Sequence, residues 1–221
     1  MIYRIAIDGP AGAGKSTIAK AAAKELCIDY VDTGAMYRAM ALYLIRQGID
    51  RNDTAQIEKA CEDADISISY DNGKQVVLLF GENVNDFLRT EEVGNMASMS
   101  SVNPKVRQKL VDLQQKLALR KDVVMDGRDI GTVVLPDSKC KIYLTASSHV
   151  RAKRRYDELV GKGENPDISK IEEDIIERDH RDMTREHSPL KQAEDAVLID
   201  SSDMSVEEVR DAILFEAKKR L

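Results

Sequence analysis

Hydrophobic residues occur in two patterns along this chain. Some form short continuous runs, and others recur every three to four positions over longer stretches. The apolar runs predict buried strands at positions 2–7, 27–31, 123–125, 142–144 and 197–199. The stripes predict helices at positions 17–26, 35–47, 53–63, 104–119 and 168–185. Strands that alternate with helices in this order are typical of an α/β fold, a parallel sheet flanked by helices. Ligands of such sheets collect at the carboxyl ends of the strands.

One region departs from this alternation. Residues 66–70 alternate apolar and polar, Asn72-Gly73 forms a tight turn signal, and the apolar stretch 75–80 follows. A β-hairpin is therefore predicted inside a βα chain. We interpret residues 65–95 as a small inserted subdomain within a single domain spanning residues 1–221.

The amino-acid composition argues against several classes of protein. The formal net charge of −6 over 221 residues argues against sequence-independent binding of nucleic acid, which needs a basic surface. Three scattered cysteines without a C-x-x-C pair suggest neither a disulfide framework nor a zinc site. No signal-like or membrane-spanning apolar run is visible. These features predict a soluble cytoplasmic protein, which we expect to be a monomer with no membrane partner.

The strongest chemical signal is a glycine-rich segment between the first strand and the first helix. It fits G-x-x-x-x-G-K-[ST], whose backbone N–H groups and following helix start surround a phosphate chain. Lys15 is placed to reach the β- and γ-phosphates, and Ser16 to offer its hydroxyl to Mg²⁺. We expect the nucleotide-binding residues to be Gly9, Pro10, Ala11, Gly12, Ala13, Gly14, Lys15, Ser16 and Thr17.

A second signal lies on the helix at 168–185. Its apolar stripe of Ile168, Ile171 and Ile175 continues, at steps of three and four residues, into Arg178, Asp182 and Arg185. Charges that extend a buried stripe favour a ligand-facing role, because charges are rarely placed toward an interior without a partner. The alternative is a solvated helix end held by ion pairs.

Two further sets of charges are less specific. Arg151, Arg154 and Arg155 follow Ser148 on a predicted helix, where they either surround a transferring phosphate or are simply solvated. Asp126 ends the strand at 123–125, as a metal-binding acid beside a P-loop would. A role in capping the following turn is equally compatible with its position.

Taken together, these motifs resemble the bacterial cytidylate kinase family, and the resemblance runs essentially end to end. Its most specific parts are Asp32-Thr33-Gly34-Ala35-Met36-Tyr37-Arg38 and Asp126-Gly127-Arg128-Asp129-Ile130-Gly131-Thr132. The P-loop itself is shared by many families. The resemblance implies a nucleoside-monophosphate-kinase fold with a five-stranded parallel sheet, a monophosphate-binding insertion and a helical lid over residues 148–166.

The resemblance also implies a reaction, ATP with CMP or dCMP giving ADP with CDP or dCDP in the presence of Mg²⁺. It assigns ATP contacts in the lid to Arg151, Arg154 and Arg155. From the motifs themselves we expect the metal ligands to be Ser16 and Asp126. The catalytic cations would be Lys15, Arg38, Arg128 and Arg185, of which the arginines hold the CMP phosphate. The remaining substrate contacts would come from Thr33, Ser98, Arg107 and Asp129 around the base, from Arg178 and Asp182 at the pentose, and from Tyr37.

Two other functions remain open from the sequence. A P-loop kinase for another nucleoside monophosphate or small acceptor would share the same loop. A nucleotide switch without a transfer substrate would need a guanine-reading N-K-x-D segment, and the nearest stretch, Asn83-Val84-Asn85-Asp86, lacks the lysine.

Overall fold

The computed structural model describes residues 3–220, and Met1, Ile2 and Leu221 lie outside the described part. The predicted strands and helices are present within it, with ends that agree to within two residues, apart from the predicted start of the first strand at Ile2, which lies outside the described part. The strands are β1 (Arg4–Asp8), β2 (Asp29–Asp32), β3 (Ile66–Asp71), β4 (Lys74–Leu79), β5 (Glu82–Asn83), β6 (Val123–Gly127), β7 (Cys140–Thr145) and β8 (Val197–Asp200). The helices are α1 (Lys15–Leu26), α2 (Thr33–Arg46), α3 (Thr54–Asp63), α4 (Glu91–Ser100), α5 (Pro104–Ala118), α6 (Ser148–Gly161), α7 (Ile168–Thr184) and α8 (Val206–Arg220), with short turns η1 (Asn85–Phe87) and η2 (Ile130–Val134).

The described chain divides into two compact units. The first, which we call the P-loop unit, comprises residues 3–28 and 123–220, and the second, the mid-chain unit, comprises residues 29–122. The predicted insertion at 65–95 falls inside the mid-chain unit. The predicted lid at 148–166 falls inside the P-loop unit.

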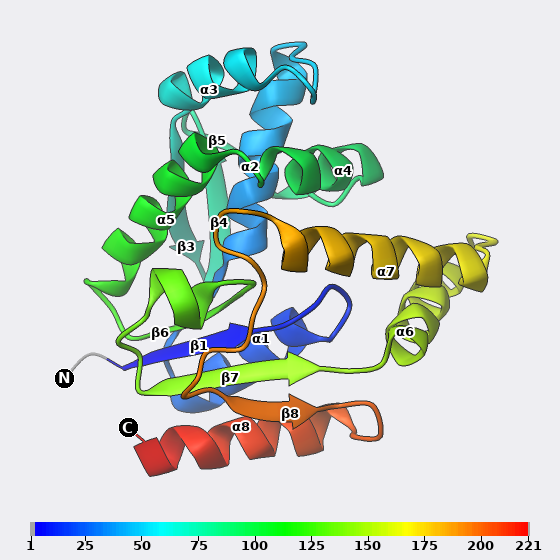
Figure 1. Ribbon diagram of the computed structural model, residues 1–221. Helices are drawn as coiled ribbons and strands as arrows, with labels where there is room; N and C mark the ends of the chain where they lie inside the picture. The colour runs from blue at the N-terminus through cyan, green and yellow to red at the C-terminus, as the bar shows by residue number, and fades with distance from the viewer. Residues whose placement is uncertain (1–2, 221) are drawn as a thin grey trace. The chain divides into compact units, whose positions relative to one another are not determined.

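A five-stranded sheet of order β2-β6-β1-β7-β8 forms the centre of the fold. Within the P-loop unit, β1 pairs in parallel with β6 and with β7, and β7 pairs in parallel with β8. The strands are buried because they carry continuous apolar residues such as Ile5, Met125 and Leu144. Helix α1 packs against β1 and β6, and α8 packs against α1 and β7 (Figure 1). The predicted α/β class with a helix-flanked parallel sheet is confirmed.

A close backbone approach fixes the turn after β1. Gly9 has a φ of 152°, and a Cβ at this position would lie 1.9 Å from the carbonyl oxygen of Leu144 on β7. Only glycine fits between these two strands. The chain can therefore turn directly from the sheet into the glycine-rich loop and α1.

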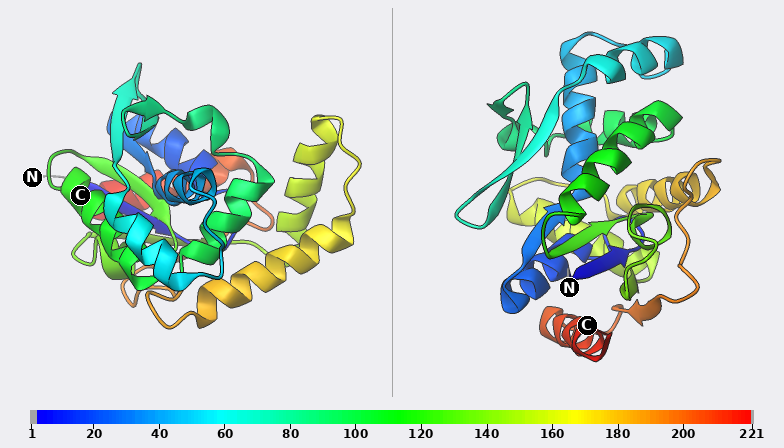
Figure 2. Two further views of the ribbon diagram at one scale, coloured as in Figure 1. Left: turned by 90° about the horizontal axis from the view of Figure 1, so that it is seen from above. Right: turned by 90° about the vertical axis from the view of Figure 1, so that its left-hand side faces the viewer.

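Helices α6 and α7 pack against each other as a helical hairpin (Figure 2). Each begins at a side-chain cap: Ser147 accepts a hydrogen bond from the N–H of Val150, and Asp167 accepts from Ser169 and Lys170. Gly163, with a φ of 84°, lies in the connection between them. The apolar stripe predicted for α7 is most deeply buried at Ile175.

The mid-chain unit combines four helices with a three-stranded antiparallel sheet of order β3-β4-β5. The hairpin turn lies at Asn72 and Gly73, both with positive φ, as the sequence predicted. Asp32 caps α2 through the N–H of Ala35. Helix α2 packs against α4, and α3 packs against α5.

Along α5 the sequence predicts a buried stripe of Val106, Leu110, Leu113 and Leu117, and only its first half is correct. Val106 and Leu110 are fully buried, but Leu113 and Leu117 are only half-buried. The buried face continues in steps of four to Gln114 and Ala118 instead. Steps of three and of four residues are both compatible with helical periodicity. The spacing alone could therefore not decide whether Leu113 and Leu117 or Gln114 and Ala118 are buried.

The three cysteines occupy different environments. Cys27 is exposed and caps α1 at its C-terminus with a φ of 55°. Cys61 and Cys140 are buried, and burial raises the pKa of both thiols, for Cys140 to about 11. Among residues 3–220, no helix combines the length and apolar character needed to span a bilayer.

Candidate active site

The P-loop joins the carboxyl end of β1 to the N-terminus of α1, as its sequence predicted. Lys15 is buried, and its Nζ donates a hydrogen bond to the carbonyl of Pro10 at 2.7 Å. Burial lowers the pKa of Lys15 to about 7, and the positive charge of Arg128 lowers it in the same direction. An anionic phosphate at this position would favour the protonated form of Lys15 and so gain a strong electrostatic contact.

Ser16 and Asp126 lie together beside the loop. The Ser16 hydroxyl donates to a carboxylate oxygen of Asp126 at 2.9 Å, although 110 residues separate them in sequence. A hydroxyl and a carboxylate are hard oxygen donors of the kind Mg²⁺ prefers. Residues 3–220 hold no group of three or more His, Cys, Asp or Glu side chains arranged for a metal. Mg²⁺ in nucleotide sites commonly takes few protein ligands, so this pair fits such an ion.

Asp8, at the end of β1, forms hydrogen bonds with the backbone of the segment that follows β6. Its two carboxylate oxygens accept hydrogen bonds from the N–H groups of Ile130 and Gly131, both at 2.7 Å. Burial raises the pKa of Asp8 to about 6 despite these two bonds, which act in the opposite direction. A Cβ on Gly131 would lie 3.3 Å from Asp8 and 3.2 Å from Lys141. Asp8 thus fixes the segment that carries Arg128 and Asp129.

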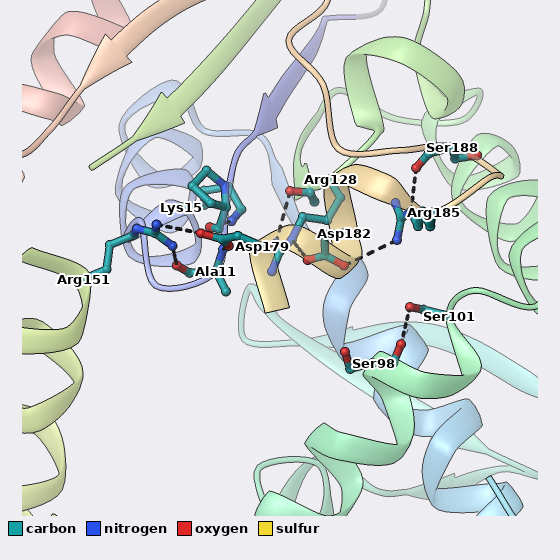
Figure 3. A network of polar contacts seen from close by, with 12 residues as sticks. Ala11, Lys15, Ser98, Ser101, Arg128, Arg151, Asp179, Asp182, Arg185 and Ser188 are labelled. Carbon is teal, nitrogen blue, oxygen red and sulfur yellow. Dashed lines mark hydrogen bonds and ion pairs between the residues drawn. The ribbon is translucent and has the colours of Figure 1, made fainter. Parts of the chain in front are cut away.

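A charged cluster connects that segment to α7 (Figure 3). Arg128 Nε donates to Asp182 at 2.8 Å, and Arg185 Nη1 lies 3.7 Å from the other oxygen of the same carboxylate. Arg185 Nε also donates to the carbonyl of Ser188 at 2.7 Å. Burial opposes the ionisation of Asp182, yet Arg128, Arg178 and Arg185 together hold its pKa below the usual value. The structure therefore brings together charges that the periodicity of α7 had placed on one face.

The three candidate arginines of α6 lie in different environments. Arg151 is buried, donates from Nη1 to the carbonyl of Ala11 at 2.7 Å, and pairs with Asp179 at 2.6 Å. Arg154 donates to the carbonyl of Ser201 at 2.6 Å. Arg155 is exposed and pairs with Glu158 on the same helix. Arg151 thus hydrogen-bonds the P-loop, and Nη1 of Arg154 lies 4.0 Å from the position that a Cβ on Gly14 would occupy.

The predicted residues of the mid-chain unit occupy three of its helices. Thr33, Tyr37 and Arg38 lie on α2, Ser98 on α4 and Arg107 on α5. Arg107 is buried, donates from Nη1 to the carbonyl of Ser101 at 3.1 Å, and lies over the ring of Tyr37 at 5.5 Å from its centroid. The Ser101 hydroxyl donates to the carbonyl of Ser98 at 2.9 Å.

Comparison with known proteins identifies the family. Residues 5–219 match the family described as cytidylate kinase. A cytidylate kinase of Caldicellulosiruptor saccharolyticus is 50% identical over 95% of this chain and 93% of its own length. The chain belongs to the cytidylate kinase family. A cytidylate kinase of Listeria innocua is 45% identical over 98% of this chain and 96% of its own length.

Solved structures of distant sequence share the fold of this cytidylate kinase family member. The shikimate kinase of Bacteroides thetaiotaomicron superimposes with a TM-score of 0.50 at 12% identity, over 99% of this chain and 98% of its own. An uncharacterized protein of Eubacterium ventriosum gives a TM-score of 0.53 at 15% identity, with both chains covered fully. At such low identity the likeness concerns the fold alone.

Sequence reasoning left two residues of this cytidylate kinase family member without a role. Asp8 follows the first predicted strand and Asp179 lies on the predicted helix at 168–185, and the sequence assigned a role to neither. The available signal for Asp179 was its spacing, four residues after the buried Ile175 and three before Asp182. For Asp8 no local signal existed, because its partners Ile130 and Gly131 lie 122 and 123 residues away.

Proposed function

We propose that this protein transfers the γ-phosphoryl group of ATP to CMP or dCMP, forming ADP and CDP or dCDP. Membership of the cytidylate kinase family and curated relatives with that name support the proposal. The observation that carries it is the arrangement of Lys15, Ser16, Asp126 and Arg128 where β1 and β6 end. This arrangement offers two cations and a hard oxygen pair to a chain of phosphates.

On the donor side, the P-loop N–H groups and Lys15 would hold the phosphates of ATP. Ser16 and Asp126 would hold Mg²⁺, which when bound neutralises charge on the phosphate oxygens. Arg151, Arg154 and Arg155 are proposed to cover the donor nucleotide from α6. Their contacts differ, so their contributions should decrease from Arg151 to Arg155.

On the acceptor side, a phosphate oxygen of CMP forms the new bond to the γ-phosphorus while the bond to the β-γ bridging oxygen breaks and ADP leaves. The incoming oxygen is already anionic, so positioning and charge neutralisation suffice and no general base is required. Arg38, Arg128 and Arg185 are proposed to hold the CMP phosphate. Arg178 and Asp182 would bind the pentose, and the base pocket would comprise Thr33, Tyr37, Ser98, Arg107 and Asp129.

A coupled assay of ADP formation with CMP, dCMP, UMP and AMP tests this proposal. We expect Mg²⁺-dependent ADP formation that is fastest with CMP or dCMP. A higher kcat/KM with UMP, AMP or a metabolite hydroxyl would indicate a kinase for another acceptor. Rapid ATP hydrolysis that no acceptor stimulates would indicate a nucleotide switch.

A further inference from the structure

Both polar groups of the Ala11 peptide backbone are held by side chains from the helical hairpin (Figure 3). The carbonyl oxygen of Ala11 accepts from Nη1 of Arg151 at 2.7 Å. The N–H of Ala11 donates to Oδ1 of Asp179 at 3.3 Å. The other carboxylate oxygen, Oδ2, pairs with Nη2 of Arg151 at 2.6 Å. Arg151 and Asp179 therefore form a closed ring of contacts with one residue of the P-loop.

Arg151 is also fixed from its own side. Its Nε donates to the carbonyl of Ala146 at 2.9 Å, so the guanidinium is bound to three acceptors at once. Its Cβ lies 3.3 Å from the position that a Cβ on Gly12 would occupy. Both Arg151 and Asp179 are buried, with 5% and 8% of their surface exposed. A buried ion pair with this many hydrogen bonds holds its geometry firmly, and removal of one partner leaves an uncompensated charge.

We propose that Asp179 is a positioning residue for the donor nucleotide, acting through Arg151 and the Ala11 peptide to set the shape of the P-loop. This inference rests on the proposed function, because it assigns Asp179 to the ATP side of that reaction. Asp179 lies three residues before Asp182, which we place at the pentose of CMP, so two acids of one helix would serve opposite substrates. The carboxylate aligns Arg151 and fixes the loop whose N–H groups bind the phosphates.

The test is Asp179→Asn, measured by separate KM values for ATP and CMP. The amide keeps the size of the side chain and one acceptor, but it loses the charge and turns an NH₂ group toward one of its two donors, Arg151 or the Ala11 N–H. We expect the KM for ATP to rise about 10- to 100-fold, the loss expected for one charge-assisted contact. The KM for CMP should stay within about twofold. Calorimetry should show the same selective loss for MgADP and an unchanged affinity for CMP. Glu173→Gln, an exposed charge on the same helix, is the matched control and should change neither.

Arg151→Lys provides a second route if Asp179→Asn does not fold. Lysine keeps the charge and the aliphatic stem beside Gly12, but a single ammonium cannot reproduce the fork that spans Ala146, Ala11 and Asp179. It should again raise the KM for ATP selectively. An unchanged KM for ATP in either folded variant would overturn the proposal, as would an equal rise for CMP. If the wild-type protein does not phosphorylate CMP at all, the proposed function fails, and MgADP binding by the two variants still tests the role of Asp179.

Discussion

The candidate residues of the P-loop unit and of the mid-chain unit are held in place by different means. In the P-loop unit, contacts join segments far apart in sequence, such as Ser16 with Asp126 and Ala11 with Asp179, 110 and 168 residues apart. In the mid-chain unit, the hydrogen bonds from Ser101 to Ser98 and from Arg107 to Ser101 span three and six residues. Donor-site geometry therefore depends on the completed fold, whereas Ser98 and Arg107 combine these local hydrogen bonds with one longer-range contact, that of Arg107 over the Tyr37 ring. Substitutions in the two units should consequently produce different kinetic defects.

The largest expected effect is on the donor side. Lys15→Ala should abolish most phosphoryl transfer, because a cation at the transferring group commonly contributes about 10²–10³-fold or more in rate. CMP affinity should remain nearly intact. Transfer rates and calorimetry with CMP measure the two quantities, and Lys24→Ala on the exposed face of α1 is the control. A comparable loss of CMP affinity would show that Lys15 also serves the acceptor.

The next effect concerns the base. Cytosine presents an amino donor at C4 and an acceptor at N3, whereas uracil presents the reverse. Asp129 can only accept when ionised, and Arg107 can only donate, so together they match cytosine. Asp129→Ala or Arg107→Met should lower kcat/KM for CMP by about 10- to 1,000-fold and that for UMP by much less. A CMP-to-UMP ratio as large as in the wild type would exclude the substituted residue as a base reader.

Substitution of Asp182 should have a smaller effect, which concerns both catalysis and stability. Asp182→Ala should impair CMP phosphorylation about 10- to 100-fold, since it removes a charge-assisted contact to the pentose. It should also lower the free energy of unfolding by about 3 kcal/mol, because Arg128 loses its carboxylate partner. Kinetics and thermal unfolding separate the two effects, with Asp174→Ala as an exposed control on α7. A change in melting temperature alone would make Asp182 a purely structural ion-pair residue.

The smallest effect is a pH dependence of stability. Asp8 has a pKa of about 6 in the folded protein against an ordinary value of 3.8, so the folded state binds its proton more tightly. Its contribution to the free energy of unfolding is therefore fully present below about pH 4. It decreases by about 2–3 kcal/mol as the pH rises through 6. Urea unfolding from pH 4 to 8 should show a flatter profile for Asp8→Asn. Parallel profiles for the two proteins would show that Asp8 does not titrate in this range.

The sequence predicted best those features that depend on residues close together in the chain. The P-loop, the capped helices and the hairpin turn at Asn72-Gly73 could all be predicted, since each depends on residues a few positions apart. Long-range pairings could not, because Asp8 and Gly131 meet only when β1 and β6 become neighbours. The periodicity of α7 placed Asp182 and Arg185 on its buried face, but it did not separate Asp179 from exposed neighbours such as Glu177. The orientation of the α6 arginines was likewise undetermined, since it depends on which face packs on α7 and the P-loop.

The three cysteines differ in burial, and this difference allows selective labelling of one of them. Cys61 and Cys140 are buried thiols with raised pKa values, so both should react slowly with maleimides while the protein remains folded. Cys27 is exposed at the end of the helix that begins at Lys15, about 18 Å along its axis from the phosphate loop. A fluorophore can therefore be attached at this one site without prior mutagenesis. It would lie at the end of α1 opposite the phosphate loop.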